Sequence, residues 1–266
     1  MGWASEEFAS IDLGDTRRDR RAIHLIDRLA EHPTASIPGA CNGWAETQAA
    51  YRFLGSERYD WLDILEPHRQ CTQRRMAAYP VVLCLQDTTE LDFNGQTIKG
   101  LGPLSYEAQR GMYLHPTYAV TPEREPLGVL DAWMWAREPK DADGQRPGGP
   151  ESLRWKEGYE RVADLARELP DTRLVYVADR EADILDLMVR ARDLATPADW
   201  LLRAKHNRAL PGGEGQKLWG RVLDTEPLGE VRFTVPPGRG RTARTVRQEL
   251  YAQRVSLSDR RQGHLE

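Results

Sequence analysis

The sequence lacks any long apolar run and has few cysteines. No stretch of the 266-residue chain approaches the roughly 20 apolar residues that a membrane-spanning helix needs. The first residues, MGWASEEFASIDLGD, have none of the basic-then-apolar layout of a secretory signal. Cys41, Cys71 and Cys84 are odd in number and show no CxxC spacing. These absences predict a cytoplasmic protein with reduced thiols and no zinc site.

The chain also lacks an overall positive charge, but its charge is unevenly distributed. The net charge is −4 and the isoelectric point is near 5.9, which by themselves do not suggest a nucleic-acid partner. Between Arg203 and Arg261, however, 13 Lys and Arg face 6 Asp and Glu, so this segment carries +7 and the remainder −11. Such asymmetry fits a basic arm on an acidic body. A solvated surface that is rich in arginine explains the composition equally well.

Helical patterns fill roughly the first 75 residues. Asp15 is a plausible N-cap for a helix from Arg17 to Glu31 that Pro33 ends. Two further helices are predicted over Trp44–Leu54 and Trp61–Arg75. The sequence therefore predicts a helical N-terminal domain over residues 1–75.

From Pro80 onward the patterns indicate an α/β core, here assigned to residues 76–205. Val81–Leu85 and Leu174–Ala178 are short apolar runs, which are typical of strands buried on both faces. The other predicted strands are His115–Thr121, Leu127–Ala136 and Trp200–Ala204, and the predicted helices are Ser152–Leu169 and Glu181–Leu194. Glu138–Pro150 is rich in Pro, Gly and Asp and is predicted to be an exposed loop.

The remaining residues, 206–266, are predicted to form a small β-rich unit. Val231–Val235 and Val246–Val255 alternate like strands of an antiparallel sheet, and Arg239–Arg241 is the expected hairpin tip.

Two aspartates share one sequence context, because each directly follows an apolar strand. If the two strands are neighbours, Asp87 and Asp179 meet at one edge of the sheet. A hard cation such as Mg²⁺ takes oxygen ligands and keeps several waters, so two or three carboxylates suffice to bind it. Paired metals activate water or a 3′-hydroxyl and stabilise the leaving oxygen of a phosphodiester.

Local structural roles for the same aspartates stay open. Asp179 could cap the following helix, and Asp87 could be a turn residue. The neighbouring acids are more often surface or supporting groups than direct metal ligands; they are Glu90, Asp92, Glu181 and Asp183.

Several ordered motifs resemble the IS4/Tn5-type DNA transposases. Residues 177–184 read VADREADI, which is similar to the DREADI segment of that family, and 85–89 read LQDTT, which looks like the strand of its first catalytic aspartate. Residues 13–18 (LGDTRR) and 50–53 (AYRF) resemble its N-terminal DNA-binding signatures, and 203–206 (RAKH) match a basic segment after the second aspartate.

The resemblance implies an RNase H-like mixed sheet with flanking helices, preceded by a small helical DNA-binding domain and followed by part of a β-rich insertion. It implies an Asp-Asp-Glu site for Mg²⁺ or Mn²⁺, with Asp87 and Asp179 as its catalytic, metal-binding aspartates. The expected partner is double-stranded DNA, at transposon ends and at the target. The implied activity is metal-dependent DNA cleavage and strand transfer by a bacterial protein that associates with the nucleoid when it is bound to DNA.

The same resemblance implies DNA contacts by five cationic side chains. Arg203 and Lys205 would hold transposon-end DNA beside the metal site. The other three match the N-terminal signatures; they are Arg17, Arg18 and Arg52. For these three, a solvated helix face or pairing with Asp15 and Asp19 is the alternative.

The sequence departs from the family in its last part. The family's third acid lies in a Tyr-x-x-Arg-x-x-x-Glu-x6-Lys motif on a helix. The nearest match is Tyr251–Arg254, but position 258 is Ser. We therefore expect a C-terminally truncated chain without the catalytic Glu or the dimerisation helices, so that both activity and the family's homodimer are in doubt. The alternatives are a non-catalytic, regulatory DNA-binding fragment and an RNase H-like nuclease that uses Glu181.

Overall fold

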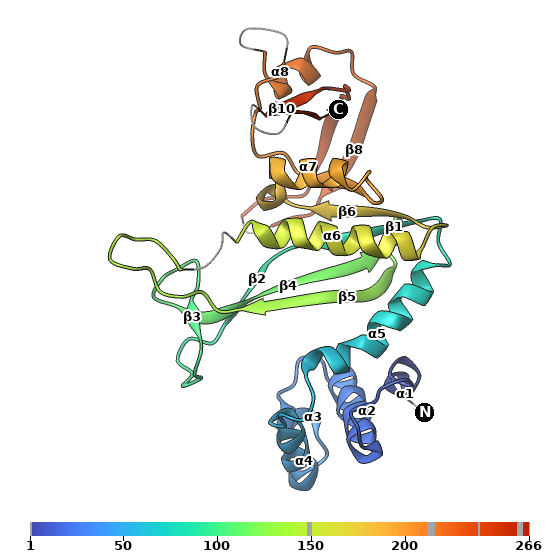
Figure 1. Ribbon diagram of the computed structural model, residues 1–266, viewed down its shortest axis with the longest axis vertical. Coiled ribbons are helices and arrows are strands. Elements are labelled where there is room, and N and C mark those ends of the chain that lie inside the picture. Colours follow the sequence, from blue (N-terminus) through green and yellow to red (C-terminus); the bar gives the residue numbers. More distant parts are fainter. Residues whose placement is uncertain (1, 148–150, 212–215, 239, 260–262, 266) are drawn as a thin grey trace.

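The protein has three parts arranged along its longest axis (Figure 1). The computed structural model describes residues 2–147, 151–211, 216–238, 240–259 and 263–265. Helices of the N-terminal region lie at one end, a mixed sheet with its helices lies in the middle, and a small β-rich part lies at the other end. Within the described residues, no helix is both long and apolar enough to cross a membrane.

The N-terminal region is helical, as predicted. Asp15 caps its second helix, because its side chain accepts a hydrogen bond from the Arg17 backbone N–H at 2.8 Å. A buried cluster that includes Ala22, Leu25 and Phe53 holds the helices together. The helices are α1 (Trp3–Glu7), α2 (Thr16–Glu31), α3 (Ile37–Ala40), α4 (Trp44–Leu54) and α5 (Trp61–Met76).

The central sheet is mixed, which confirms the predicted fold class. Its main strand order is β2-β4-β1-β6-β7, and β3 and β5 also pair with β4. Strands β1 and β6 are parallel, as are β6 and β7, whereas β4 runs antiparallel to β1 and to β5. The strands are β1 (Val81–Gln86), β2 (Thr89–Asp92), β3 (Gly102–Pro103), β4 (Arg110–Val120), β5 (Pro126–Trp135), β6 (Arg173–Ala178) and β7 (Asp199–Leu202).

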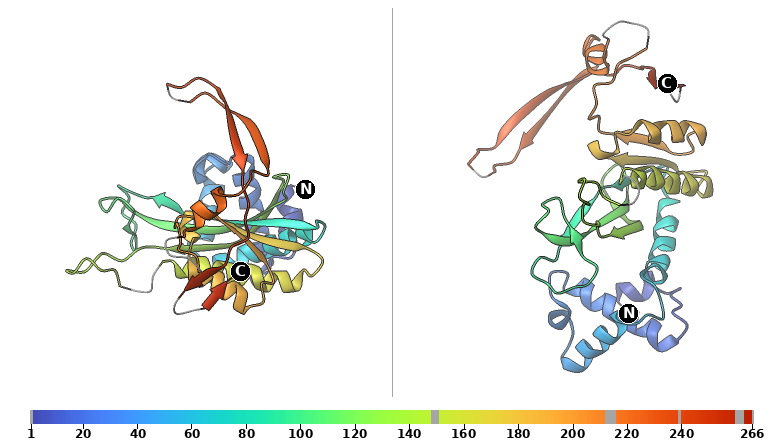
Figure 2. Two further views of the ribbon diagram at one scale, coloured as in Figure 1. Left: turned by 90° about the horizontal axis from the view of Figure 1, so that it is seen from above. Right: turned by 60° about the vertical axis from the view of Figure 1, so that its left-hand side comes forward.

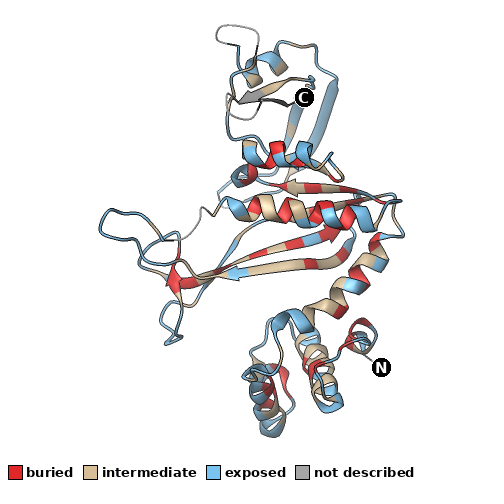
Figure 3. Ribbon diagram, viewed as in Figure 1, coloured by how far each residue is buried: buried red, intermediate tan, exposed pale blue. Residues whose placement is uncertain are grey.

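Helix α6 (Leu153–Glu168) packs on one face of this sheet and forms the main core. Tyr159 and Val162 of α6 are buried in one cluster with Val82 and Cys84 of β1 (Figure 3). The alternate residues of β1 are only half-buried, so the prediction of a strand buried on both faces is wrong. Because α6 covers one face of the sheet, every second residue of β1 is buried, and this alternation cannot be seen in a run of uniformly apolar residues.

The predicted helix from Glu181 to Leu194 is interrupted. The chain forms a 3-10 turn, η1 (Arg180–Ala182), and then α7 (Leu185–Asp193). Between them, Asp183 turns its side chain toward the backbone of residues 205 and 206 instead of continuing a helix. A tertiary contact therefore ends the first turn.

The C-terminal part holds a projecting two-stranded hairpin (Figure 2). Strands β8 (Gly229–Val235) and β9 (Arg244–Leu250) pair antiparallel, as predicted, but the second strand ends at Leu250 rather than Val255. Arg239 of the expected tip lies outside the described residues. The remaining elements are α8 (Leu218–Leu223), β10 (Leu257–Asp259) and β11 (Gly263–Leu265).

Candidate functional site

Asp87 and Asp179 lie next to each other in the sheet. The parallel register of β1 and β6 ends with Gln86 opposite Ala178, and each aspartate is the next residue of its strand. Both aspartates are exposed at the same edge. The structure therefore brings together the two carboxylates that sequence reasoning singled out.

Both aspartates also have local structural roles. Oδ1 of Asp179 accepts the Glu181 backbone N–H at 2.8 Å and so caps η1, and Oδ1 of Asp87 accepts the Thr88 N–H at 2.8 Å. These bonds fix the orientation of each carboxylate. The capping interpretation is thus confirmed for Asp179, and it is compatible with a cation on the exposed side.

A third acidic residue, Glu181, interacts electrostatically with both aspartates. Burial raises the pKa of Glu181, and the charges of Asp179 and Asp87 raise it further. Like charges that share a site disfavour ionisation, and a divalent cation relieves that repulsion. Among the described residues, however, no three His, Cys, Asp or Glu side chains are arranged to hold a metal ion. Asp87 and Asp179 are the two exposed carboxylates at this edge that could bind a cation.

The predicted basic residues lie at the same edge. The backbone N–H of Arg203 donates to the carbonyl of Ala178 at 3.1 Å, so Arg203 lies beside the strand that leads into Asp179. The backbone N–H of Lys205 donates to Asp183 at 2.6 Å. Both Arg203 and Lys205 are exposed. The edge therefore has two exposed aspartates, and two exposed basic residues lie in the segment that follows β7.

Asp183 is a structural anchor that sequence reasoning treated only as a nearby acid. It is buried, it also accepts the His206 N–H at 2.7 Å, and its Oδ1 lies 2.8 Å from Nη1 of Arg208. Burial would raise the pKa of Asp183, but these hydrogen bonds and the Arg208 charge outweigh it and lower the pKa. Asp183 thus anchors the segment that carries Arg203 and Lys205.

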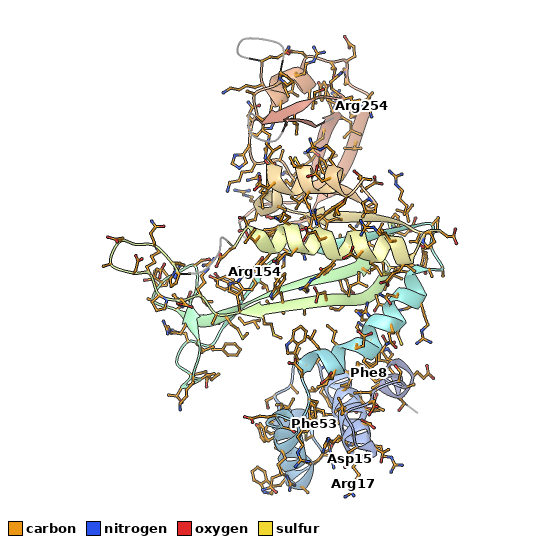
Figure 4. All side chains as sticks on the ribbon, viewed as in Figure 1. Phe8, Asp15, Arg17, Phe53, Arg154 and Arg254 are labelled. Atoms are coloured by element: carbon orange, nitrogen blue, oxygen red, sulfur yellow. The ribbon has the colours of Figure 1, made fainter. Side chains whose placement is uncertain are left out.

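The three predicted N-terminal arginines differ in their surroundings. Arg17 is exposed near the end of the helical region farthest from the sheet (Figure 4). Arg52 is exposed on α4, and its Nε donates to the Gln48 carbonyl at 3.3 Å. Arg18 is half-buried and donates to the Leu13 carbonyl at 2.8 Å, so at least part of its role is structural.

Further cations lie on the same helix as Arg17. Arg17, Arg20, Arg21 and His24 line one shallow surface hollow of about 470 Å³. His24 also contacts Glu46 at 2.6 Å.

A polar pocket of about 260 Å³ adjoins the two aspartates through Thr88 and Glu181. His115 of β4 and Arg154 of α6 also line it. His115 is 2% exposed, and its Nδ1 lies 2.7 Å from the Thr88 hydroxyl. Sequence reasoning missed this pocket. The alternating pattern of β4 was a signal for the inward position of His115, but no local signal marks Arg154.

Comparison with known proteins gives a family match and similarities to solved structures. Residues 1–59 match the family described as transposase DNA-binding. The fold also aligns with a piggyBac transposase in a synaptic complex with hairpin DNA, at 9% identity and a TM-score of 0.36, over 98% of this chain. The chain spans 59% of the length of that protein, and so low a score does not establish a shared fold. The N-terminal helical region is therefore similar to the DNA-binding region of transposases.

Proposed function

We propose that the protein is a transposase of the IS4/Tn5 type that binds DNA through its N-terminal helical region. The observation that carries this proposal is the family match over residues 1–59. The cationic face of α2 supports it, because Arg17, Arg20 and Arg21 point into one hollow on the surface. Clustered cations bind the phosphate backbone by displacing its counterions.

We further propose that the edge formed by Asp87 and Asp179 is the catalytic centre and takes Mg²⁺ or Mn²⁺. Adjacent carboxylates at the ends of parallel strands provide hard oxygen ligands. A bound divalent cation supplies Lewis-acid charge for phosphodiester cleavage and strand transfer. Arg203 and Lys205 hold the DNA backbone beside the carboxylates, and Asp183 keeps their segment in place.

The DNA-binding proposal is tested by fluorescence anisotropy with a random-sequence duplex at several salt concentrations. We expect salt-sensitive binding, and we expect the double variant Arg20→Gln/Arg21→Gln to bind at least tenfold more weakly with a smaller salt slope. Arg167→Gln is the control, because Arg167 lies on α6 and pairs with Asp164. Binding that is equal for the wild type and the double variant would refute the role of α2.

The metal proposal is tested by calorimetric titration with Mn²⁺. We expect Asp87→Asn and Asp179→Asn each to weaken binding at least tenfold. Asp171→Asn is the control, since this exposed acid precedes β6 at its opposite end. Retained Mn²⁺ affinity in both site variants would reject the catalytic centre. Duplex binding without any Mn²⁺ binding would favour the alternative, a DNA-binding regulator that does not cut.

A further inference from the structure

Two arginines of α6 stack on two tryptophans of β5, but only one of them has an anionic partner. The guanidinium of Arg154 lies 3.7 Å from the centre of the Trp135 ring, and that of Arg161 lies 4.3 Å from the centre of the Trp133 ring. Arg161 also forms an ion pair with Asp131. No ion pair of Arg154 is found within the described ranges. The two arginine–tryptophan pairs have the same stacked geometry, but only Arg161 has an ion-pair partner within the described residues.

The missing partner is costly at this position. Arg154 is half-buried, and its Nε has no hydrogen-bond partner within the described part of the chain. Burial lowers the pKa of Arg154 despite attraction from Glu151 and Glu157. Glu151 itself is held by Arg137, whose Nε and Nη2 each lie 2.6 Å from one of its oxygens. A half-buried cation that has nearby carboxylates but no ion pair is stabilised further when a ligand supplies a direct anionic partner.

A second unsatisfied group lines the same pocket. Nε2 of His115 has no hydrogen-bond partner among the described residues, although the side chain is 2% exposed. Burial, followed by the positive charge of Arg154, lowers the pKa of His115 to about 4, so the ring is neutral near pH 7. Nε2 itself is buried, so His115 acts as a neutral wall of the pocket that fixes Thr88 through Nδ1.

The beginning of α6 adds to the same environment. Helix α6 starts at Leu153, and Ser152 makes no capping hydrogen bond through its side chain. The first N–H groups of a helix favour negative charge nearby. Arg154 lies at this end of α6 (Figure 4). Arg154 and the helix end are suited to an anionic oxygen, and three carboxylates also line the pocket, those of Glu90, Glu151 and Glu181.

We propose that the pocket lined by Arg154, His115 and Thr88 is a subsite for one phosphate group of a DNA strand that passes the Asp87–Asp179 edge. The pocket adjoins that edge through Thr88 and Glu181. Arg154 supplies the charge, and Trp135 holds its guanidinium flat. The choice of a DNA strand as the source of the phosphate rests on the proposed function.

The test is a titration with a single-stranded thymidine trinucleotide, followed by the ¹⁵N-indole resonance of Trp135 in the presence of EDTA. We expect a saturable shift in the wild type and in Arg161→Gln, and a response at least tenfold weaker in Arg154→Gln. Arg154→Lys should retain part of the response, because it keeps the charge but loses the planar donor geometry. A response of Arg154→Gln that equals the wild type would overturn the proposal.

Two further arms need no variant. A trinucleotide with neutral methylphosphonate linkages should leave Trp135 of the wild type unshifted, and an equal shift would contradict phosphate recognition. Inorganic phosphate is the other probe, and a response to it alone, without one to the trinucleotide, would refute a DNA strand as the ligand. If the protein binds the duplex but the Trp135 resonance does not shift with the trinucleotide, the subsite is refuted and the proposed DNA binding by α2 stands. If the Trp135 resonance shifts with the trinucleotide but the protein does not bind the duplex, the proposed DNA binding by α2 is refuted and the subsite stands.

Discussion

Asp183 and Arg208 form a buried ion pair across 25 residues of sequence, with Oδ1 of the aspartate 2.8 Å from Nη1 of the arginine. The second oxygen of Asp183 accepts the backbone N–H groups of Lys205 and His206. One carboxylate thus fixes the segment that follows β7 against the start of α7. This contact holds the backbone of Lys205 and His206 against the turn that follows Asp179.

Asp183→Ala should destabilise the protein by about 3 kcal/mol or more, because Arg208 and two N–H groups lose their buried partner. The free energy of unfolding in urea measures this loss. Asp171→Ala serves as the exposed control and should change it by less than about 0.5 kcal/mol. Equal stabilities of the Asp183 variant and the wild type would show that the pair makes no net contribution.

Glu7 of α1 holds two side chains of α5, Arg75 and His68, that also contact β5. It is 6% exposed, its oxygens lie 2.8 Å from Nη1 and Nη2 of Arg75, and Oε1 lies 2.6 Å from Nδ1 of His68. Nε2 of His68 accepts the Val129 N–H of β5 at 2.9 Å. We expect Glu7→Ala to cost about 2 kcal/mol, less than a fully buried pair, because Arg75 is partly exposed.

The control for Glu7 is its exposed neighbour, Glu6→Ala. Burial would raise the pKa of Glu7, but the hydrogen bonds and charge of Arg75, together with the hydrogen bond to His68, outweigh it and lower the pKa below 4.5. A lowered folded-state pKa stabilises the protein above the unfolded pKa, and this contribution disappears as the pH falls through the folded value. The loss of unfolding free energy caused by Glu7→Ala should therefore become smaller as the pH falls. Urea unfolding that shows a constant cost between pH 7 and about pH 3 would contradict this ionic role.

Gly158 of α6 provides the space for a buried amide. A Cβ at this position would lie 2.1 Å from Oε1 of Gln86, whose amide is fixed by hydrogen bonds to Thr117 and Tyr176. Alanine normally favours a helix over glycine by about 1 kcal/mol, but the clash should reverse the sign and destabilise by about 1–3 kcal/mol. Thermal and urea unfolding of Gly158→Ala measure the change.

The matched double variant separates the clash from other effects. Adding Gln86→Ala to Gly158→Ala removes the group that the new methyl meets, so the two costs should be less than additive. Strict additivity would show that the two residues do not interact. Because Gln86 immediately precedes Asp87, this packing also supports the edge of the sheet.

His115 should make the protein sensitive to acid. Burial first, and then Arg154, lower the pKa of His115 from 6.5 to about 4, with a small opposing effect from Asp131. The unfolded chain therefore binds a proton before the folded protein does, so stability falls as the pH drops from 6.5 toward 4. Below pH 4 the complete loss of folding free energy from this histidine is about 3 kcal/mol. His115→Phe should remove this part of the pH dependence, and an unchanged stability difference between the two proteins from pH 7 to pH 4 would refute it.

Local sequence patterns predict most of the elements and both aspartates. The apolar runs before Asp87 and Asp179 predict strands, and parallel pairing of those strands is sufficient to bring the two carboxylates to one edge. The same patterns fail at Asp183, where a helix was predicted and a partner 25 residues away ends the turn. The periodicity of apolar residues predicts contacts only between residues within the same helical turn or strand.

The positions of helices and strands, the acids that follow the strands and the transposase-like motifs can all be predicted from the chain alone, because they depend on residues that are close together in it. The pairing of Glu7 with Arg75, the hold of Asp183 on residues 205–208 and the carboxylate partner of Arg161 appear only once the chain is folded. The same is true of the stacking of Arg154 on Trp135. Burial and charge pairing depend on which distant segments pack together, and no local pattern specifies that packing.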